Sequence, residues 1–230
     1  MTKIVSIGLF YFFLLCLGGC TNEKKAREEQ ATSTSQETAK PIKATKNILI
    51  FGNSLTAGYG LEPAEAYPSL LQNRIDSLQL PYKIINAGLS GETTAGGNSR
   101  LDWVLKNPVD IFILELGGND GLRGIPATET RKNLQAMIDK VKTKYPKATI
   151  ILAGMQVPPS MGKKYAEEIR TIYPELAKKN QVNLIPFLLE NVGGEVALNQ
   201  KDGIHPNAEG AKIVANNVWA ILKELIDQST

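Results

Sequence analysis

From residue 46 onward, short apolar runs alternate with segments in which apolar residues recur at every third or fourth position. The apolar runs predict five β-strands, at residues 47–51, 82–86, 109–116, 149–153 and 182–186. The third and fourth runs are apolar at consecutive positions, which is typical of strands covered on both faces. We therefore expect a sheet that is buried on both sides.

Two of the segments between and after these runs have the period of an amphipathic helix. Their apolar positions are Leu134, Met137, Ile138 and Val141 in the first, and Ala211, Val214, Ala215, Val218, Leu222 and Leu225 in the second. Strands that alternate with helices are joined by right-handed crossovers, which gives a parallel sheet between two helical layers. The predicted fold class is α/β, a three-layer α/β/α sandwich with a five-stranded parallel sheet, flavodoxin-like in plan.

The first 20 residues have the organisation of an export signal. Lys3 precedes an apolar run at 4–17, and the sequence then reaches Leu-Gly-Gly-Cys20. The run is shorter than the roughly 20 residues that a membrane-spanning helix needs, so a cleaved signal is favoured. Residues 17–20 resemble a bacterial lipobox, which implies that 1–19 is removed and that lipidated Cys20 holds the chain on a membrane. An ordinary signal peptide with a chance cysteine and an uncleaved anchor are the alternatives.

Residues 21–45 consist mainly of Glu, Lys, Ala, Ser, Thr and Gln, with almost no large apolar side chain. Such a segment cannot bury enough apolar surface to fold, so we expect a tether with a root-mean-square reach of roughly 25–30 Å. The predicted organisation is a signal peptide at 1–19, a lipidated cysteine and tether at 20–45, and one globular domain at 46–230. We expect an extracytoplasmic, membrane-anchored lipoprotein. Because Thr21 after the cysteine is not acidic, an outer membrane is favoured where one exists.

Composition narrows the classes of function. The 230 residues, 43% hydrophobic and 21% charged, suffice for one core, and the formal net charge is only +3. Nucleic acid is not an expected partner, because no long basic run is interleaved with aromatic residues. Cys16 and Cys20 both precede the folded part and His205 is the one histidine, so we expect no disulfide, metal site or cofactor in the domain. We expect a monomer.

A serine stands where the first predicted strand ends. The run at 47–51 stops at Gly52, and Ser54 follows in a turn of small, polar residues. Ligands of open parallel sheets gather at the carboxyl ends of the strands, and a hydroxyl there is well placed to be a nucleophile. The alternative is a Gly-Ser turn that merely links a strand to a helix. Further polar and glycine-rich segments follow the other strands, at 86–91, 117–120 and 202–206.

A serine nucleophile needs a base to take its proton and an acid to hold that base in the correct tautomer. His205 is the one histidine, far from Ser54 in the chain but predicted on the same rim of the sheet. Asp202 lies three residues before it and can accept a hydrogen bond from the imidazole Nδ1. Pro206 is predicted to begin the last helix, where its missing N–H has no cost. A capped helix start with a polar neighbour is the alternative interpretation.

Acyl transfer also needs donors for the oxyanion of the tetrahedral intermediate. The candidates are the backbone N–H groups of Ser54 and Gly88 and the side-chain amide of Asn119. Gly88 could otherwise be a turn glycine, and Asn119 a helix cap. These alternatives do not explain why all the candidates fall at strand ends on one predicted rim.

Four sequence blocks resemble those of the SGNH, or GDSL-type, serine hydrolases. The blocks are Gly52-Asn53-Ser54-Leu55, Gly88, Gly-Gly-Asn119-Asp and Asp202-x-x-His205-Pro, in the order of that family. The longer stretches FGNSLTAGYGL, INAGLSGETTAGG, LELGGNDGLRG and DGIHPN are similar to the branch that contains thioesterase I, lysophospholipases and arylesterases.

The resemblance implies the SGNH hydrolase fold and an esterase of arylesterase, lysophospholipase or thioesterase type. It also implies Ser54 as the nucleophile, Asp202 and His205 as its triad partners, and Ser54, Gly88 and Asn119 as the oxyanion hole. Asn53 is a departure, because the family usually has Asp before the serine. An amide keeps an acceptor oxygen and gains donors, but it removes a charge beside the nucleophile.

The substrate is less constrained. Leu122, Ile125, Pro158, Pro159 and Met161 fall in loops on the same rim, where they either line an acyl pocket or pack beneath the loops. Because acyl-CoA is cytosolic, an exported enzyme is expected to act on lysophospholipids or other small acyl esters.

Other functions stay open. The same fold and triad serve carbohydrate O-acetyl esterases, and a catalytically silent lipoprotein that binds glycans or phosphate is a further alternative. A nucleotide-binding module is disfavoured, because residues 52–60 lack both the Gly-Lys-Ser/Thr ending of a P-loop and the Gly-x-Gly-x-x-Gly of a dinucleotide fold.

Overall fold

The computed structural model describes residues 45–227. Five strands pair in parallel in the order β2-β1-β3-β4-β5, which confirms the predicted α/β fold. The strands are β1 (Lys46–Gly52), β2 (Tyr82–Gly88), β3 (Ile111–Glu115), β4 (Thr149–Ala153) and β5 (Asn183–Ile185). At the carboxyl end of β1, Gly52 pairs with Gly88 on one side and with Glu115 on the other.

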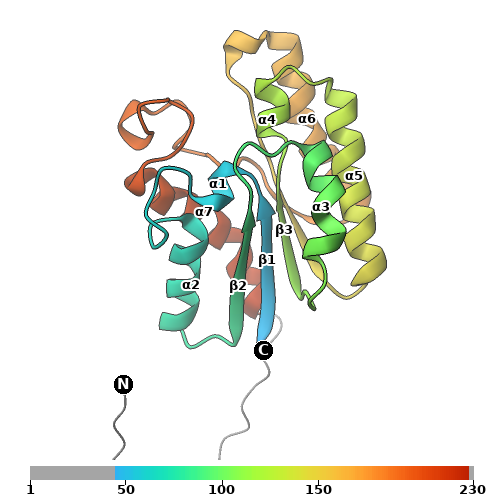
Figure 1. The fold of residues 1–230 in the computed structure, drawn as a ribbon, viewed down its shortest axis with the longest axis vertical. Coiled ribbons are helices and arrows are strands. Elements are labelled where there is room, and N and C mark those ends of the chain that lie inside the picture. Colours follow the sequence, from blue (N-terminus) through green and yellow to red (C-terminus); the bar gives the residue numbers. More distant parts are fainter. Residues whose placement is uncertain (1–44, 228–230) are drawn as a thin grey trace, which may run out of the picture. The chain divides into compact units, whose positions relative to one another are not determined.

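The described residues contain seven α-helices: α1 (Ser54–Ala57), α2 (Tyr67–Ser77), α3 (Thr94–Val104), α4 (Gly118–Leu122), α5 (Ala127–Lys144), α6 (Lys163–Asn180) and α7 (Ala208–Asp227). Two short 3-10 helices, η1 (Pro159–Met161) and η2 (Val196–Leu198), lie in loops. Figure 1 shows α2 and α7 on one face of the sheet and α3, α5 and α6 on the other, with α1 at the tip of β1. The predicted three-layer arrangement is therefore correct.

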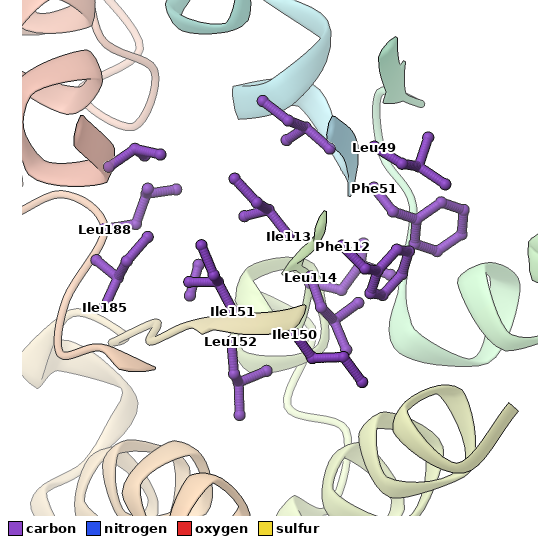
Figure 2. Close-up of a cluster of buried hydrophobic side chains, with 14 of the residues drawn as sticks. Leu49, Phe51, Phe112, Ile113, Leu114, Ile150, Ile151, Leu152, Ile185 and Leu188 are labelled. Atoms are coloured by element: carbon purple, nitrogen blue, oxygen red, sulfur yellow. The ribbon is translucent and has the colours of Figure 1, made fainter. Parts of the chain in front are cut away.

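The core is built where the predicted apolar positions meet. All four predicted positions of α5 are fully buried, and five of the six in α7 are buried while Leu225 is partly exposed. Side chains of neighbouring strands lie side by side in Figure 2, with Phe51 next to Phe112 on one face of the sheet and Ile113 next to Ile151 on the other. The rings of Phe51 and Phe112 stack with their centroids 6.0 Å apart. This core makes the sheet a rigid platform for its loops.

The third and fifth strands are shorter than predicted. Val109 and Leu116 are buried but lie outside the paired part of β3, so apolar continuity overestimates the strand. The chain turns away directly afterwards, because Gly117 adopts φ +110° and begins the entry to α4.

The start of the last helix is also different from the prediction. α7 begins at Ala208, and Asn207 caps it by accepting from the backbone N–H groups of Glu209 and Gly210. Pro206 instead pairs with Asn199 in an isolated antiparallel bridge. The prediction for Pro206 was wrong because the side chain of Asn207 supplies the cap one residue later.

The predicted signal peptide, Cys20 and nearly all of the tether lie outside the described residues. Within residues 45–227, no helix is both long enough and apolar enough to cross a membrane.

Candidate active site

Ser54 sits on a tight turn between β1 and α1. It is the first residue of α1 and is 7% exposed, and Asn53 before it caps the helix by accepting from the N–H of Leu55 at 2.9 Å. Gly58, with φ +77°, ends the helix after a single turn. A side chain at Gly52 would collide with Thr56 and Glu115, so only glycine allows this packing. These residues hold the hydroxyl at the carboxyl rim of the sheet.

The loop before α7 brings the predicted base and acid to Ser54. His205 Nε2 lies 2.9 Å from Ser54 Oγ, and His205 Nδ1 lies 2.7 Å from Asp202 Oδ2. The other oxygen of Asp202 accepts from the backbone N–H groups of Ile204 and His205, at 2.9 and 3.0 Å. An Asp–His–Ser arrangement of this geometry can move a proton from the hydroxyl to the imidazole.

The carboxylate of Asp202 is ionised at neutral pH. Its partial desolvation raises the pKa, but the hydrogen bonds from the backbone N–H groups of His205 and Ile204 and the contact with the imidazole lower it to about 2. An ionised Asp202 accepts from Nδ1–H, which leaves Nε2 without a proton and able to accept from Ser54 Oγ. The tautomer that general-base chemistry requires is thereby favoured.

Asn119 lies beside this site, at the start of α4. Its Nδ2 donates to the carbonyl of Glu92 at 2.9 Å, which ties α4 to the loop after β2. In the part of the chain that the structure describes, no second acceptor engages this amide, so its other hydrogen can serve an incoming oxygen.

Gly88 does not have the free donor that the oxyanion prediction needs. Its N–H donates to Asn86 Oδ1 at 2.9 Å, and a side chain there would collide with the backbone of Ala57 in α1. Gly88 is therefore a close-packing glycine in this structure. By contrast, the N–H groups of Ser54 and Gly91 have no hydrogen-bond partner among residues 45–227. Gly91, with φ +79°, is the second glycine of the predicted segment 86–91, of which the sequence-based prediction named only Gly88.

A cavity of about 470 Å³ opens beside Ser54 and His205. Its apolar lining comes from α4 and from three loops of the rim and includes Leu122, Met155, Val157, Phe187, Leu189 and Ile204. Of the predicted pocket residues, Leu122, Pro158 and Pro159 line it. Ile125 and Met161 do not. The Ile125 carbonyl accepts from Tyr165, and Met161 packs against the core.

The chain is similar to known proteins in both sequence and fold. The GDSL-like Lipase/Acylhydrolase family matches residues 50–213. The chain belongs to this family. Esterase TesA of Pseudomonas aeruginosa is 37% identical over 184 residues, which cover 80% of this chain and 90% of that protein. Thioesterase 1/protease 1/lysophospholipase L1 of Escherichia coli K12 is 36% identical over 188 residues, covering 81% and 88%.

Solved structures of esterases have the same fold as this chain. The crystal structure of TesA superposes with a TM-score of 0.75 at 37% identity, over 78% of this chain and 99% of that one. That of AlinE4, an SGNH-hydrolase family esterase, gives 0.65 at 43% identity, over 79% and 97%. Like these GDSL-family relatives, the chain is an ester-hydrolysing enzyme.

Asn53, where the chain departs from the family, is hydrogen-bonded to a residue that the sequence did not single out. Glu115, at the end of β3, is fully buried and accepts from the backbone N–H and the Nδ2 of Asn53, at 3.0 and 2.8 Å, and from Thr56 Oγ1 at 2.8 Å. Burial raises the pKa of this carboxyl to about 7, although the hydrogen bonds from Thr56 and Asn53 oppose the rise. In the sequence, this contact could have been suspected because Glu115 is an acidic residue at the end of the apolar run Phe-Ile-Leu-Glu.

Proposed function

We propose that this GDSL-family enzyme hydrolyses carboxylic esters through an acyl-enzyme on Ser54, with His205 as general base and Asp202 as its orienting acid. The observation that carries the proposal is the pair of contacts from Ser54 Oγ to His205 Nε2 at 2.9 Å and from His205 Nδ1 to Asp202 at 2.7 Å. Nucleophile and base within 3 Å need no rearrangement before attack.

In the first half-reaction, Ser54 Oγ bonds to the acyl carbon while its proton moves to His205 Nε2. The carbonyl oxygen becomes an oxyanion. When the intermediate collapses, the bond to the alcohol oxygen breaks and Nε2 returns its proton to that oxygen, so an alcohol leaves and an acyl ester of Ser54 remains.

In the second half-reaction, water takes the place of the alcohol. Its oxygen bonds to the acyl carbon as one proton passes to His205 Nε2. The bond from carbon to Ser54 Oγ then breaks, and Oγ receives that proton. The products are a carboxylic acid and the starting enzyme, so no other reactant is required.

For the oxyanion we propose the backbone N–H of Ser54, the free hydrogen of Asn119 Nδ2 and the N–H of Gly91. The unused N–H groups of Ser54 and Gly91 support this set. So does the Asn119 contact with Glu92, which brings α4 to the residue after Gly91. One donor of this kind is typically worth about 100- to 1000-fold in rate.

The proposed substrates are aliphatic acyl esters, including lysophospholipids. The cavity beside Ser54 is mostly apolar and, at about 470 Å³, far larger than an acetyl group. This size favours longer acyl chains over the acetyl groups that a carbohydrate O-acetyl esterase removes.

Activity-based labelling tests the mechanism. A fluorophosphonate probe should label the wild type and fail to label Ser54→Ala, and His205→Ala should label at a strongly reduced rate. Labelling of Ser54→Ala at the wild-type rate would contradict the assignment of the nucleophile, and an unlabelled wild type would favour a silent binding protein.

An ester panel tests the substrate class. Hydrolysis of p-nitrophenyl esters of increasing chain length, lysophosphatidylcholine, palmitoyl-CoA and an acetylated xylan should rank the longer oxyesters first. A marked preference for the CoA thioester or for the acetylated sugar would overturn the proposal.

For the cellular site we propose an extracytoplasmic lipoprotein anchored through Cys20, acting as a monomer. The lipobox-like Leu-Gly-Gly-Cys20 after an apolar run supports it. Metabolic labelling with an alkyne fatty acid should mark the wild type and not Cys20→Ser, and the variant should leave the membrane fraction. Equal labelling of both would exclude Cys20 as the lipid site. Light scattering on the purified domain would test the monomer.

A further inference from the structure

A short hairpin-like loop carries both Asp202 and His205. It is closed by the hydrogen bond from the N–H of Gln200 to the carbonyl of His205, at 2.7 Å. Within it, the N–H of Gly203 donates to the carbonyl of Gln200 at 2.9 Å. Gln200 thus lies at the base of the loop, where its backbone hydrogen bonds fix the position of the main chain at His205.

The side chain of Gln200 reaches across to the nucleophile's side of the site. Its Nε2 donates to the carbonyl of Tyr59 at 2.7 Å and to the carbonyl of Pro206 at 3.0 Å. Within the described residues, two hydrogen bonds join the segment 199–207 to the segment 53–61. One is the contact between His205 and Ser54, and the other is this bond from Gln200 to Tyr59.

Tyr59 and Gly60 pack closely around the hydrogen bond from Gln200 to Tyr59. The ring of Tyr59 packs against the imidazole of His205 with the two centroids 4.7 Å apart. Next to it, Gly60 has φ +73°, and a side chain there would collide with Gln200 Oε1. The glutamine amide therefore lies directly on the backbone that follows α1.

We propose that Gln200 is a positioning residue whose side-chain amide holds His205 in place during deacylation. This inference rests on the acyl-enzyme mechanism proposed above. In the free enzyme, the hydrogen bond from Ser54 Oγ itself helps to locate Nε2. In the acyl-enzyme, Oγ is an ester oxygen and has no proton to donate, so that contact is lost.

The imidazole must then accept a proton from a mobile water molecule. Among residues 45–227, the bond from Gln200 to Tyr59 is then the remaining hydrogen bond between the loop of His205 and the turn of Ser54. Loss of the bridge should consequently slow the attack of water more than the attack of Ser54. A misplacement of about 1 Å in a catalytic group can cost on the order of 100-fold in rate.

Pre-steady-state hydrolysis of p-nitrophenyl butyrate separates the two steps. The initial burst of p-nitrophenolate gives the acylation rate constant, and the steady phase gives deacylation. For Gln200→Ala we expect deacylation to fall by about 10- to 100-fold while acylation stays within about threefold. The acyl-enzyme should accumulate in intact-mass spectra, and hydroxylamine, a stronger nucleophile than water, should restore turnover.

Two further variants make the test independent of folding. Gln200→Glu keeps the shape of the side chain but replaces the amide donors by carboxylate oxygens that face two carbonyls, so it should show the same split. Lys201→Ala, an exposed neighbour in the same loop, should match the wild type in both constants. Circular dichroism melting of each variant establishes the folded state.

The outcomes are distinct. Equal losses in acylation and deacylation for both Gln200 variants, or no change in either, would overturn the role of Gln200. Failure of the wild type to form an acyl adduct on Ser54 would instead overturn the proposed mechanism itself.

Discussion

The side-chain amide of Asn53 donates to the buried carboxylate of Glu115 at 2.8 Å, directly behind the nucleophilic turn. Where the GDSL family usually has a second carboxyl group, this chain has a donor that complements an acceptor. The substitution therefore leaves the turn intact, since Asn53 still caps α1 through its Oδ1. It also removes the need for two buried carboxyl groups to share a proton.

Restoring the acid at this position should introduce pH dependence. In Asn53→Asp, two carboxyl groups would face each other at the same contact, so one must stay protonated. We expect the ratio of variant to wild-type kcat to fall as pH rises above about 7, and to recover on acidification. Asn107→Asp, which adds the same charge at an exposed position, is the control for kcat measured between pH 5 and 9. Parallel pH profiles of the two variants would contradict the coupling.

Glu115 should make the wild-type protein less stable as pH rises. Its pKa is about 7 when folded against 4.5 for the ordinary carboxyl, so the folded state binds the proton more tightly. The corresponding stabilisation is complete below about pH 4.5 and is lost as pH rises through 7. By linkage, the free energy of unfolding should drop by roughly 2–3 kcal/mol between pH 5 and 8.

Urea unfolding at the two pH values measures this loss, and Glu115→Gln is the comparison. The amide cannot ionise, so the difference between pH 5 and 8 should shrink in the variant. Its overall stability should also be lower, because an amide nitrogen would face the N–H of Asn53. The same pH difference in both proteins would show that another group causes it. Asp202 is not that group, since its pKa of about 2 lies below this range.

Asp202→Asn should impair chemistry and not folding. The carboxylate selects the imidazole tautomer with its proton on Nδ1, and an amide can donate to that nitrogen and favour the wrong one. We expect kcat to fall by about 10³- to 10⁴-fold with a small change in KM. Asp139→Asn on the exposed face of α5 is the matched control. A loss of less than about tenfold would show that Asp202 is not the orienting acid.

The wall of the cavity should set acyl chain length. Leu122 lines it and is 37% exposed, so a larger side chain can fill the cavity without disturbing the core. In Leu122→Trp, we expect kcat/KM for long p-nitrophenyl esters to fall by about tenfold or more relative to the acetate. Leu78→Trp, at the exposed end of α2, should leave the chain-length profile unchanged. An unchanged profile in Leu122→Trp would place the acyl chain elsewhere.

The sequence alone determined the sheet, the two amphipathic helices α5 and α7, and the convergence of Ser54 with His205. A short apolar run and a helical period of 3.6 residues are local properties, and parallel strands necessarily bring their carboxyl ends to one rim. Ser54, Asp202 and His205 each follow a strand or precede a helix with recognisable turn residues, so their placement could be inferred without knowing any contact.

Tertiary structure alone decided which groups near that rim are free and which are engaged. The bond from the N–H of Gly88 to Asn86 and the cap that Asn207 provides for α7 span only two or three residues, but whether each forms depends on a backbone path that the rest of the fold sets. The pairing of Asn53 with Glu115 and the bridge from Gln200 to Tyr59, by contrast, join positions that are 62 and 141 residues apart. Hydrogen bonds of this kind depend on distances of a few tenths of an ångström between segments far apart in the chain, which local sequence patterns do not encode.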